Sequence, residues 1–234
     1  MHGWAGHLPK PSVRTIDDMR TVLADPSCRK YGTLYSMYRD LAKSEEDRSW
    51  LHCRNLRYDI TVIPPKNVCG ERVKTKGHFH PKNPAGVGYP EVYEVLEGHG
   101  HYLLQDRTCD DVVIVSADQG DLVIIPPEYG HVTINPSPDT TLAMANIVSC
   151  AFESEYGVYE QYGGGAYYEM ADGSFRKNSR YLEVPPLRTI RAAAILERFP
   201  ACRGPLYSLI GNDEALSFLN FPEKHLALFA ALLD

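Results

Sequence analysis

Residues 77–106, GHFHPKNPAGVGYPEVYEVLEGHGHYLLQD, contain four histidines arranged as two His-x-His pairs. The first pair is His78 and His80, and the second is His99 and His101. Because side chains two residues apart on a β-strand point to the same face, either pair could aim both imidazoles at one point. The stretch therefore raises the question of which pair, if either, binds a metal ion.

The sequence on both sides of this stretch indicates many short strands. Between residues 56 and 150, runs of β-branched and aromatic residues are separated by Gly, Pro, Asn and Asp. Short strands at such close spacing predict an all-β core built as an antiparallel sandwich or barrel. The expected strands are 57–64, 72–80, 91–98, 101–106, 111–116, 121–127, 131–135 and 141–149.

The two ends of the chain have helical patterns instead. Residues 15–25 begin with Thr15 three residues before Asp18, which is typical of a capping box and predicts a helix outside the main sheet. Residues 221–234 carry Pro222 where a first helical residue is tolerated, followed by apolar residues on one face, so we expect a docking helix there. The expected parts are an N-terminal helical or extended arm (1–54), a barrel (55–170) and a C-terminal extension with the docking helix (171–234), in which the role of residues 180–234 is open.

Composition excludes some classes of function. The 234 residues include 24 Lys and Arg against 30 Asp and Glu, a net charge of −6. This balance argues against a general nucleic-acid or membrane-surface binder, although a small anionic substrate remains possible. No run approaches the ~20 apolar residues that span a bilayer, and the amino terminus has no export signal pattern.

The cysteines bear on the cellular compartment. They are scattered and contain no Cys-x-x-Cys spacing that would suggest a zinc knot or a redox pair. In a chain of this size we interpret them as reduced thiols, which favours the cytoplasm. The six residues are Cys28, Cys53, Cys69, Cys109, Cys150 and Cys202.

The first His-x-His pair has partners that could complete a metal site. Glu91 opens one predicted strand, and His131 lies in a distant one. Three histidines and one carboxylate suit a divalent transition metal with open coordination positions. By contrast, the second pair follows Gly98 directly, in or beside a hairpin turn, so we expect His99 and His101 to be surface or turn residues.

The order and spacing of these residues resemble the two cupin signatures. His-x-His, then Glu91, then six residues to Gly98 follows the first signature, and Gly120, Pro126, His131 and Asn135 follow the second. The resemblance implies a cupin fold, that is, a double-stranded β-helix or jelly-roll barrel, here with N- and C-terminal helical extensions.

Two departures from the cupin pattern are visible. Ten residues (81–90) separate the first histidine pair from Glu91, where cupins usually have three or four. This insertion implies a loop over the site. Glu128 stands where the second signature usually has Gly, which affects only a turn.

Longer segments resemble the cupin-type glucose-6-phosphate isomerases of archaea and some bacteria. These segments are TKGHFHP, YPEVYEVLEGHGHYLLQ, VIIPPEYGHVTIN and EYGVYEQYGGG, and the resemblance extends over residues 55–170. It implies conversion of glucose 6-phosphate to fructose 6-phosphate, and it suggests a homodimer. It also implies one divalent metal ion per chain, commonly Fe²⁺ with Mn²⁺, Ni²⁺ or Zn²⁺ as replacements, bound by His78, His80, Glu91 and His131.

The same resemblance implies residues that contact a sugar phosphate. Thr61, Thr75 and the backbone N–H of Gly77 correspond to phosphate-binding groups, and Tyr93 and Tyr156 correspond to substrate-facing tyrosines. Hydroxyls and a backbone donor beside a glycine are chemically suited to a phosphate. The alternative for both threonines is an ordinary strand position. Strand alternation points Lys76 away from this face, so we expect it not to bind the phosphate.

The reaction moves hydrogen between C1 and C2 of the sugar. Through an enediol, Glu91 would act as the base and Tyr93 would donate to a sugar oxygen, while the metal acts as a Lewis acid. A carboxylate bound to a cation is a poor base, so either Glu91 leaves the metal or a hydride shift replaces proton transfer. The sequence leaves both routes open, together with the native metal and turnover of mannose 6-phosphate.

Two other functions fit the same residues less fully. A cupin metal-dependent oxygenase would use the same ligands, because open positions on Fe²⁺ also suit dioxygen. A non-catalytic sugar-phosphate-binding cupin would need neither Glu91 nor the tyrosines.

Overall fold

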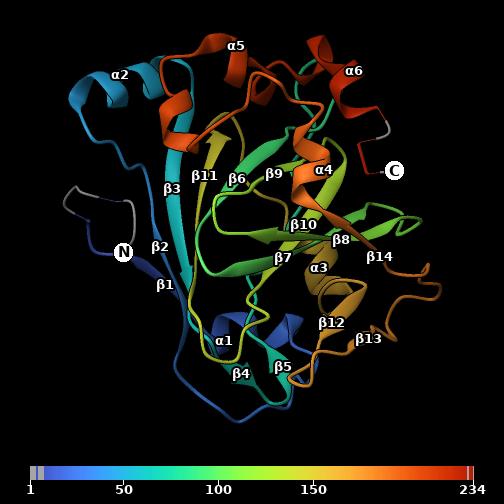
Figure 1. The fold of residues 1–234 in the computed structure, drawn as a ribbon. Helices are drawn as coiled ribbons and strands as arrows, with labels where there is room; N and C mark the ends of the chain where they lie inside the picture. Colours follow the sequence, from blue (N-terminus) through green and yellow to red (C-terminus); the bar gives the residue numbers. More distant parts are fainter. Residues whose placement is uncertain (1–3, 5–7, 231, 234) are drawn as a thin grey trace.

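Most strands belong to two sheets that pack against each other (Figure 1). The computed structural model describes residues 4, 8–230 and 232–233. The larger sheet has the strand order β1-β2-β3-β11-β6-β9. Its strands are β1 Ser12–Thr15, β2 Thr33–Tyr38, β3 Leu56–Ile63, β11 Leu142–Ser149, β6 Glu91–Glu97 and β9 Leu122–Ile125.

The second sheet has the order β10-β7-β8-β14, and β14 runs parallel to β8 while the other pairs are antiparallel. Its strands are β10 Tyr129–Ile134, β7 His99–Asp106, β8 Val112–Asp118 and β14 Arg188–Arg191. The remaining strands form two small antiparallel pairs, which are β4 Asn67–Val68 with β5 Glu71–Arg72, and β12 Tyr167–Glu169 with β13 Phe175–Lys177.

The helices are short and flank the sheets. In Figure 1, α2, α5 and α6 lie toward one end of the molecule and α1 toward the other. In the part of the chain that the structure describes, no helix has the length and apolar character to cross a membrane. The α-helices are α1 Ile16–Met19, α2 Glu45–Cys53, α3 Gly157–Gln161, α4 Ala192–Leu196, α5 Asp213–Leu216 and α6 Leu226–Phe229. The 3₁₀ helices are η1 Arg20–Val22, η2 Leu206–Leu209, η3 Ser217–Leu219 and η4 Pro222–Lys224.

Strand β11 shows how the larger sheet is covered on both faces, because all of its residues are buried. Met144 and Asn146 face an internal cavity. Ala145 is paired with Glu94 across the sheet, and the Glu94 carboxylate accepts a hydrogen bond of 2.8 Å from the N–H of Leu206. The C-terminal extension therefore covers the outer face of the sheet, and the whole is the predicted cupin fold with added terminal segments.

The N-terminal segment adds two strands to the barrel as well as a helix. β2 pairs with β3, and β1 pairs with β2, so both extend the larger sheet. The predicted capping box is confirmed: the Thr15 hydroxyl accepts from the Asp18 N–H at 3.3 Å, and the Thr15 N–H donates to the Asp18 carboxylate at 2.8 Å. The helical stretch ends at Val22, three residues earlier than expected.

The strand predicted over 72–80 is largely absent from the structure, which has only isolated bridges beyond β5. His78 bridges to His131 of β10, whereas the next residue, Phe79, bridges to Glu155. Because successive residues pair with different partners, no continuous ladder forms.

The prediction of a single docking helix over 221–234 is also wrong. Its residues form η4 and α6, separated at His225, and residues 231 and 234 lie outside the described residues. Leu226 is 53% exposed, whereas Leu232 and Leu233 are buried. Helices this short are marginal by propensity alone, so tertiary contacts decide the path of the tail.

The interpretation of all six cysteines as reduced thiols is wrong. Cys28 and Cys69 form a disulfide with a Cα–Cα distance of 5.9 Å. The contact joins positions 41 apart in the sequence, so no local pattern reveals it; Cys69 lies between β4 and β5. The disulfide also removes the argument that led from reduced cysteines to the cytoplasm. Cys53, Cys109, Cys150 and Cys202 are free.

Replacing Cys69 with Ser should lower the free energy of unfolding by up to about 4 kcal/mol, since the closed loop restricts the unfolded chain. Urea unfolding without reductant measures the change, and dithiothreitol should abolish the difference from the parent protein. Cys53→Ser, which replaces an exposed free thiol, is the matched control. Equal stability of Cys69→Ser and the parent under oxidising conditions would contradict the expectation.

Candidate active site

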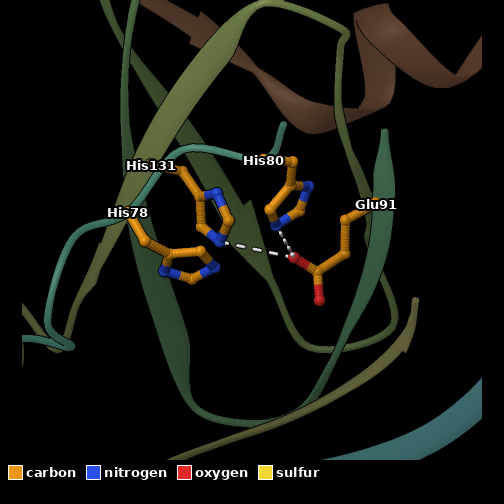
Figure 2. Close-up of side chains that lie close together, drawn as sticks. All are labelled: His78, His80, Glu91 and His131. Atoms are coloured by element: carbon orange, nitrogen blue, oxygen red, sulfur yellow. Dashed lines mark ion pairs between the residues drawn. The ribbon is translucent and has the colours of Figure 1, made fainter. Parts of the chain in front are cut away.

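Four predicted metal ligands converge inside the barrel, and Figure 2 shows their side chains pointing toward one another. His78 and His80 come from the irregular segment beside β10, His131 comes from β10, and Glu91 is the first residue of β6. One ligand atom from each residue lies within 4.8 Å of all the others. Glu91 Oε2 lies 3.5 Å from His80 Nε2 and 3.4 Å from His131 Nε2.

Hydrogen bonds fix the outer atoms of His80 and Glu91, while the inward Nε2 of His131 lies 3.0 Å from the Tyr93 hydroxyl. His80 Nδ1 lies 2.9 Å from the carbonyl oxygen of Tyr89, so Nε2 faces the cluster. Glu91 Oε1 accepts a bond of 2.7 Å from the side-chain amide of Asn146 on β11. The outer atoms of these ligands thus have partners that fix ring and carboxylate orientation, as is usual around bound metals.

The electrostatics of the cluster are set by burial. Burial lowers the pKa of His78 to about 3 and that of His80 to about 4, and it lowers the pKa of His131 well below the ordinary value. All three imidazoles are therefore neutral near pH 7 and can offer nitrogen lone pairs. Burial also raises the pKa of Glu91 to about 8, because its carboxylate loses water.

The donor set fits a divalent transition metal. Glu91 Oε2, which faces the histidines, is buried and finds no hydrogen-bond partner within the described part of the chain. An unpartnered buried carboxylate oxygen is costly unless a cation meets it. Three neutral imidazoles and one carboxylate supply the nitrogen and oxygen ligands that such ions bind.

The second histidine pair lies elsewhere and does not join this cluster. His99 and His101 are on β7, where His99 Nδ1 lies 2.7 Å from Asp118 and His101 Nδ1 lies 2.8 Å from Glu169. Gly98, at φ +81°, makes the turn before them as expected. Of the two pairs, the structure brings only His78 and His80 to the other ligands.

The cluster opens into a cavity of about 440 Å³ between the larger sheet and residues 152–156. Its lining contains four cationic side chains but only two acidic ones, so the cavity suits an anion. It is lined by Arg14, Tyr35, Met37, Arg39, Arg57, Thr61, Thr75, Lys76, His78, His80, Glu91, Tyr93, Met144, Asn146, Val148, Ser149, Phe152, Glu153, Ser154 and Tyr156.

Four of the five expected substrate residues line this cavity. Thr61 lies on β3, and Thr75 uses its hydroxyl oxygen to accept from the Thr133 N–H at 2.9 Å, which leaves the hydroxyl proton free to donate. Tyr93 Oη lies 3.0 Å from His131 Nε2, and the Tyr156 ring lies 5.5 Å from that of His78.

Gly77 is the expected residue that does not line the cavity. A Cβ at this position would lie 2.5 Å from Cδ1 of Tyr159, so the glycine allows the segment to pack against α3. The absence of a side chain at Gly77 therefore allows close packing at this position.

Two expectations about the surroundings of the site are wrong. Lys76 lines the cavity, and its Nζ lies 2.5 Å from Glu160, because the segment is not a regular strand and side chains do not alternate there. The inserted loop 81–90 does not line the cavity. Instead, Asn83 donates to Glu223 of η4 at 2.8 Å, and the Gly88 N–H donates to Glu128 at 2.9 Å.

The sequence reading missed three arginines and one asparagine of the site. Arg39 and Arg57 flank the metal ligands, Arg14 lies near Tyr156, and Asn146 binds Glu91. Alternation along β3 could have placed Arg57 on the face of Thr61, four residues away. The positions of the others depend on strand pairing that no local pattern specifies.

A family model described as glucose-6-phosphate isomerase matches residues 10–185, which is most of the chain and includes every ligand above. The chain belongs to this family. Residues 186–234, which cover the larger sheet and contact the inserted loop, lie outside the match.

Relatives in the family include glucose-6-phosphate isomerases of Pyrococcus and Thermococcus species. The glucose-6-phosphate isomerase of Pyrococcus furiosus is 30% identical over 160 residues, 66% of this chain and 78% of its own. That of Thermococcus litoralis is 31% identical over 132 residues, 54% and 63% of the two chains. Among solved structures, an oxalate oxidase is similar with a TM-score of 0.38 and 12% identity, over 53% of this chain and 55% of its own, which is too distant to inform function.

His80→Ala should remove most of the bound metal, because it deletes one of the four donors that converge on the site. Metal content of the purified variants, measured by plasma mass spectrometry after dialysis, tests this. His99→Ala is the matched control and should retain the metal of the parent protein. Retention by His80→Ala together with loss by His99→Ala would reverse the assignment of the two pairs.

The metal-free protein should lose stability as pH rises from about 6.5 to about 8. The unfolded chain releases the Glu91 proton near its ordinary pKa of 4.5, whereas the folded chain holds it to about 8. Between about pH 6.5 and about pH 8 the Glu91 carboxyl therefore binds more protons in the folded state, so its contribution to the free energy of unfolding falls by up to about 1.4 kcal/mol per pH unit. Below about pH 6.5 the three histidines act in the opposite sense, because the unfolded chain binds protons that the buried imidazoles do not. Urea unfolding of the chelator-treated protein at several pH values measures this slope.

Glu91→Gln should remove that slope, and Glu153→Gln, which alters the other acidic residue of the cavity, should retain it. An unchanged slope in Glu91→Gln would show that other groups produce the pH dependence.

Proposed function

We propose that the protein is a metal-dependent aldose–ketose isomerase that interconverts glucose 6-phosphate and fructose 6-phosphate. Membership of the glucose-6-phosphate isomerase family supports this enzyme class. The observation that carries the metal dependence is the convergence of three neutral imidazoles on a buried, unpartnered Glu91 oxygen beside a cationic cavity.

His78, His80, Glu91 and His131 would bind one divalent ion, for which we propose Fe²⁺, with Mn²⁺, Ni²⁺ or Zn²⁺ as replacements. When bound, the ion would supply a Lewis acid for the sugar oxygens at the reacting carbons. The protein contributes neutral imidazoles that need not release protons before binding it.

Glu91 and Tyr93 are the proposed catalytic residues. Glu91 would take the proton from C2 and return it to C1, with Asn146 holding its other carboxylate oxygen in place. Tyr93, two residues along β6 and on the same face, would donate its phenol proton to a sugar oxygen. Burial raises the pKa of Tyr93 well above its ordinary value. The phenol therefore stays protonated near neutral pH and can donate a hydrogen bond.

The phosphate would lie at the end of the cavity formed by Thr61, Thr75 and Tyr156. Hydroxyl donors on β3 and on the irregular segment can meet different phosphate oxygens. The backbone N–H of Gly77 is a further proposed donor. The Tyr156 ring also has two cations beside it, Arg14 at 5.9 Å and Lys76 at 5.3 Å, and these would attract the phosphate.

A coupled assay for fructose 6-phosphate tests the proposal. Glucose 6-phosphate should be converted without oxygen, chelation should abolish turnover, and restored Fe²⁺ or Mn²⁺ should recover it. Mannose 6-phosphate in parallel defines the stereochemical range of the cavity. Deuterium at C2 should exchange with solvent if Glu91 transfers a proton, whereas full retention would favour a hydride shift.

Each rival function predicts a different result in this assay. Substrate consumption that requires dioxygen would favour the oxygenase. Binding of glucose 6-phosphate without turnover, whichever divalent metal is supplied, would favour a sugar-phosphate-binding cupin. Either outcome would overturn the isomerase.

Two further expectations belong to this proposal. We expect a homodimer, which sedimentation of the purified protein measures directly. We also expect the enzyme in the cytoplasm, where its sugar phosphate substrate is available.

A further inference from the structure

Arg39 and Arg57 form a compact cationic group at the cavity. Arg39 Nη1 lies 2.6 Å and Arg57 Nε lies 2.8 Å from the same oxygen of Asp59. Asp59 is completely buried, and its second oxygen accepts from the Asp40 N–H at 2.9 Å. Two guanidinium groups share one carboxylate, so the group keeps a net charge of +1.

Both arginines remain able to meet a ligand. Their side chains are 43% and 37% exposed, and both line the cavity. Each guanidinium carries five N–H donors, and the bonds to Asp59 use only a small part of them. The remaining donors can bind an anionic group in the forked geometry that carboxylates and phosphates accept.

Strand register places this group beside the metal ligands. Asp59 pairs with Asn146, and Asn146 pairs with Tyr93 on β6. Asn146 also donates to Glu91, so the arginines lie next to the residues that would hold C1 and C2 of a sugar.

The other cations lie at the opposite end of the cavity. Arg14 on β1 pairs with Tyr35 on β2, and the Lys76 N–H donates to the Tyr35 hydroxyl at 3.1 Å. Arg39 follows directly after β2, and Tyr35 lies four residues before it, which is up to about 13 Å at about 3.3 Å per residue. Tyr58 pairs with Ile147 and Ile147 pairs with Val92, so Glu91 lies near the level of Arg57 in the sheet. The cavity therefore has one cationic group beside the metal ligands and another farther along the sheet.

We propose that Arg39 and Arg57 are a second anion-binding subsite, which takes a sugar phosphate that carries another phosphate at its carbonyl end. This inference rests on the proposed function, which assigns the first phosphate to the Thr75 end. An aldohexose bisphosphate esterified at O1 offers one phosphate to each cationic group, and its anomeric ester keeps the ring closed, so no aldehyde can form. Such a compound therefore binds as a competitive inhibitor.

Calorimetry on the metal-loaded protein with two non-reacting probes tests the subsite. Glucose 1,6-bisphosphate has both phosphates, whereas glucitol 6-phosphate has only one and lacks the carbonyl. The parent protein should bind the bisphosphate more tightly. Arg57→Gln should weaken bisphosphate binding by about tenfold or more, the usual loss for a charge-assisted hydrogen bond, and glucitol 6-phosphate binding by less than about threefold.

Three variants keep the result interpretable. Arg57→Lys retains the charge without the fork, so its affinity for the bisphosphate should lie between those of the parent and Arg57→Gln. Arg54→Gln removes a surface arginine that pairs with Asp213 outside the cavity, and it should change neither affinity. If Arg57→Gln fails to fold, Arg39→Gln leaves Asp59 paired with Arg57 and tests the same subsite.

Equal weakening of both probes by Arg57→Gln would overturn the proposal, as would equal affinity of the parent for the two probes. Calorimetry needs no turnover, so binding and activity are tested separately. A protein that is inactive but still binds the bisphosphate more tightly through these arginines would contradict the isomerase proposal and support the subsite. An active isomerase without this preference would do the reverse.

Discussion

The rest of the site depends on the burial of one carboxylate. Glu91 begins β6 of the larger sheet, with one carboxylate oxygen fixed by Asn146 and the other facing three imidazoles that carry no charge. A charge in such surroundings costs several kcal/mol unless an opposite charge meets it, and no side chain of the cluster supplies one. The protein thus maintains a place for a cation at the expense of its own stability. Strand β6, strand β10 and the segment before the inserted loop must all keep their positions for that arrangement to persist.

The fold meets this requirement by taking the four ligands from three stretches of chain and fixing each by a different contact. The backbone of Tyr89 orients His80, the bridge to β10 places His78 opposite His131, and β11 carries the asparagine that orients Glu91. Such a division limits how far a single local movement can displace the cluster. It also leaves β3 and the residue after β2 free to carry Thr61, Arg57 and Arg39, which would bind charged groups of a substrate.

Local sequence patterns predicted correctly those features that depend on residues close together in the chain. Alternation located most strands, Gly98 separated the two histidine pairs, and the Thr15 cap was visible because its partner lies three residues away. The failures share one cause, which is that the deciding contact lies far away in sequence. Lys76 turns inward because its segment pairs with two different partners, and Cys28 meets Cys69 across a separation of 41 positions. The tail breaks at His225 since packing, and not helix propensity, determines its course. Arg39 and Asn146 reach the site through cross-strand register, which a single sequence does not reveal.

Strand β11 links the family's common core to the part of this chain beyond it. Its alternate side chains form the floor of the cavity on one face and, on the other, lie under the C-terminal extension through Ala145 and its neighbour Glu94. Only one layer of backbone separates the two environments. Inserting or deleting a single residue in this strand would exchange its faces, presenting small apolar side chains to the substrate and an amide to the packing surface. A change of register in β11 would therefore disturb the C-terminal extension and the cavity at the same time.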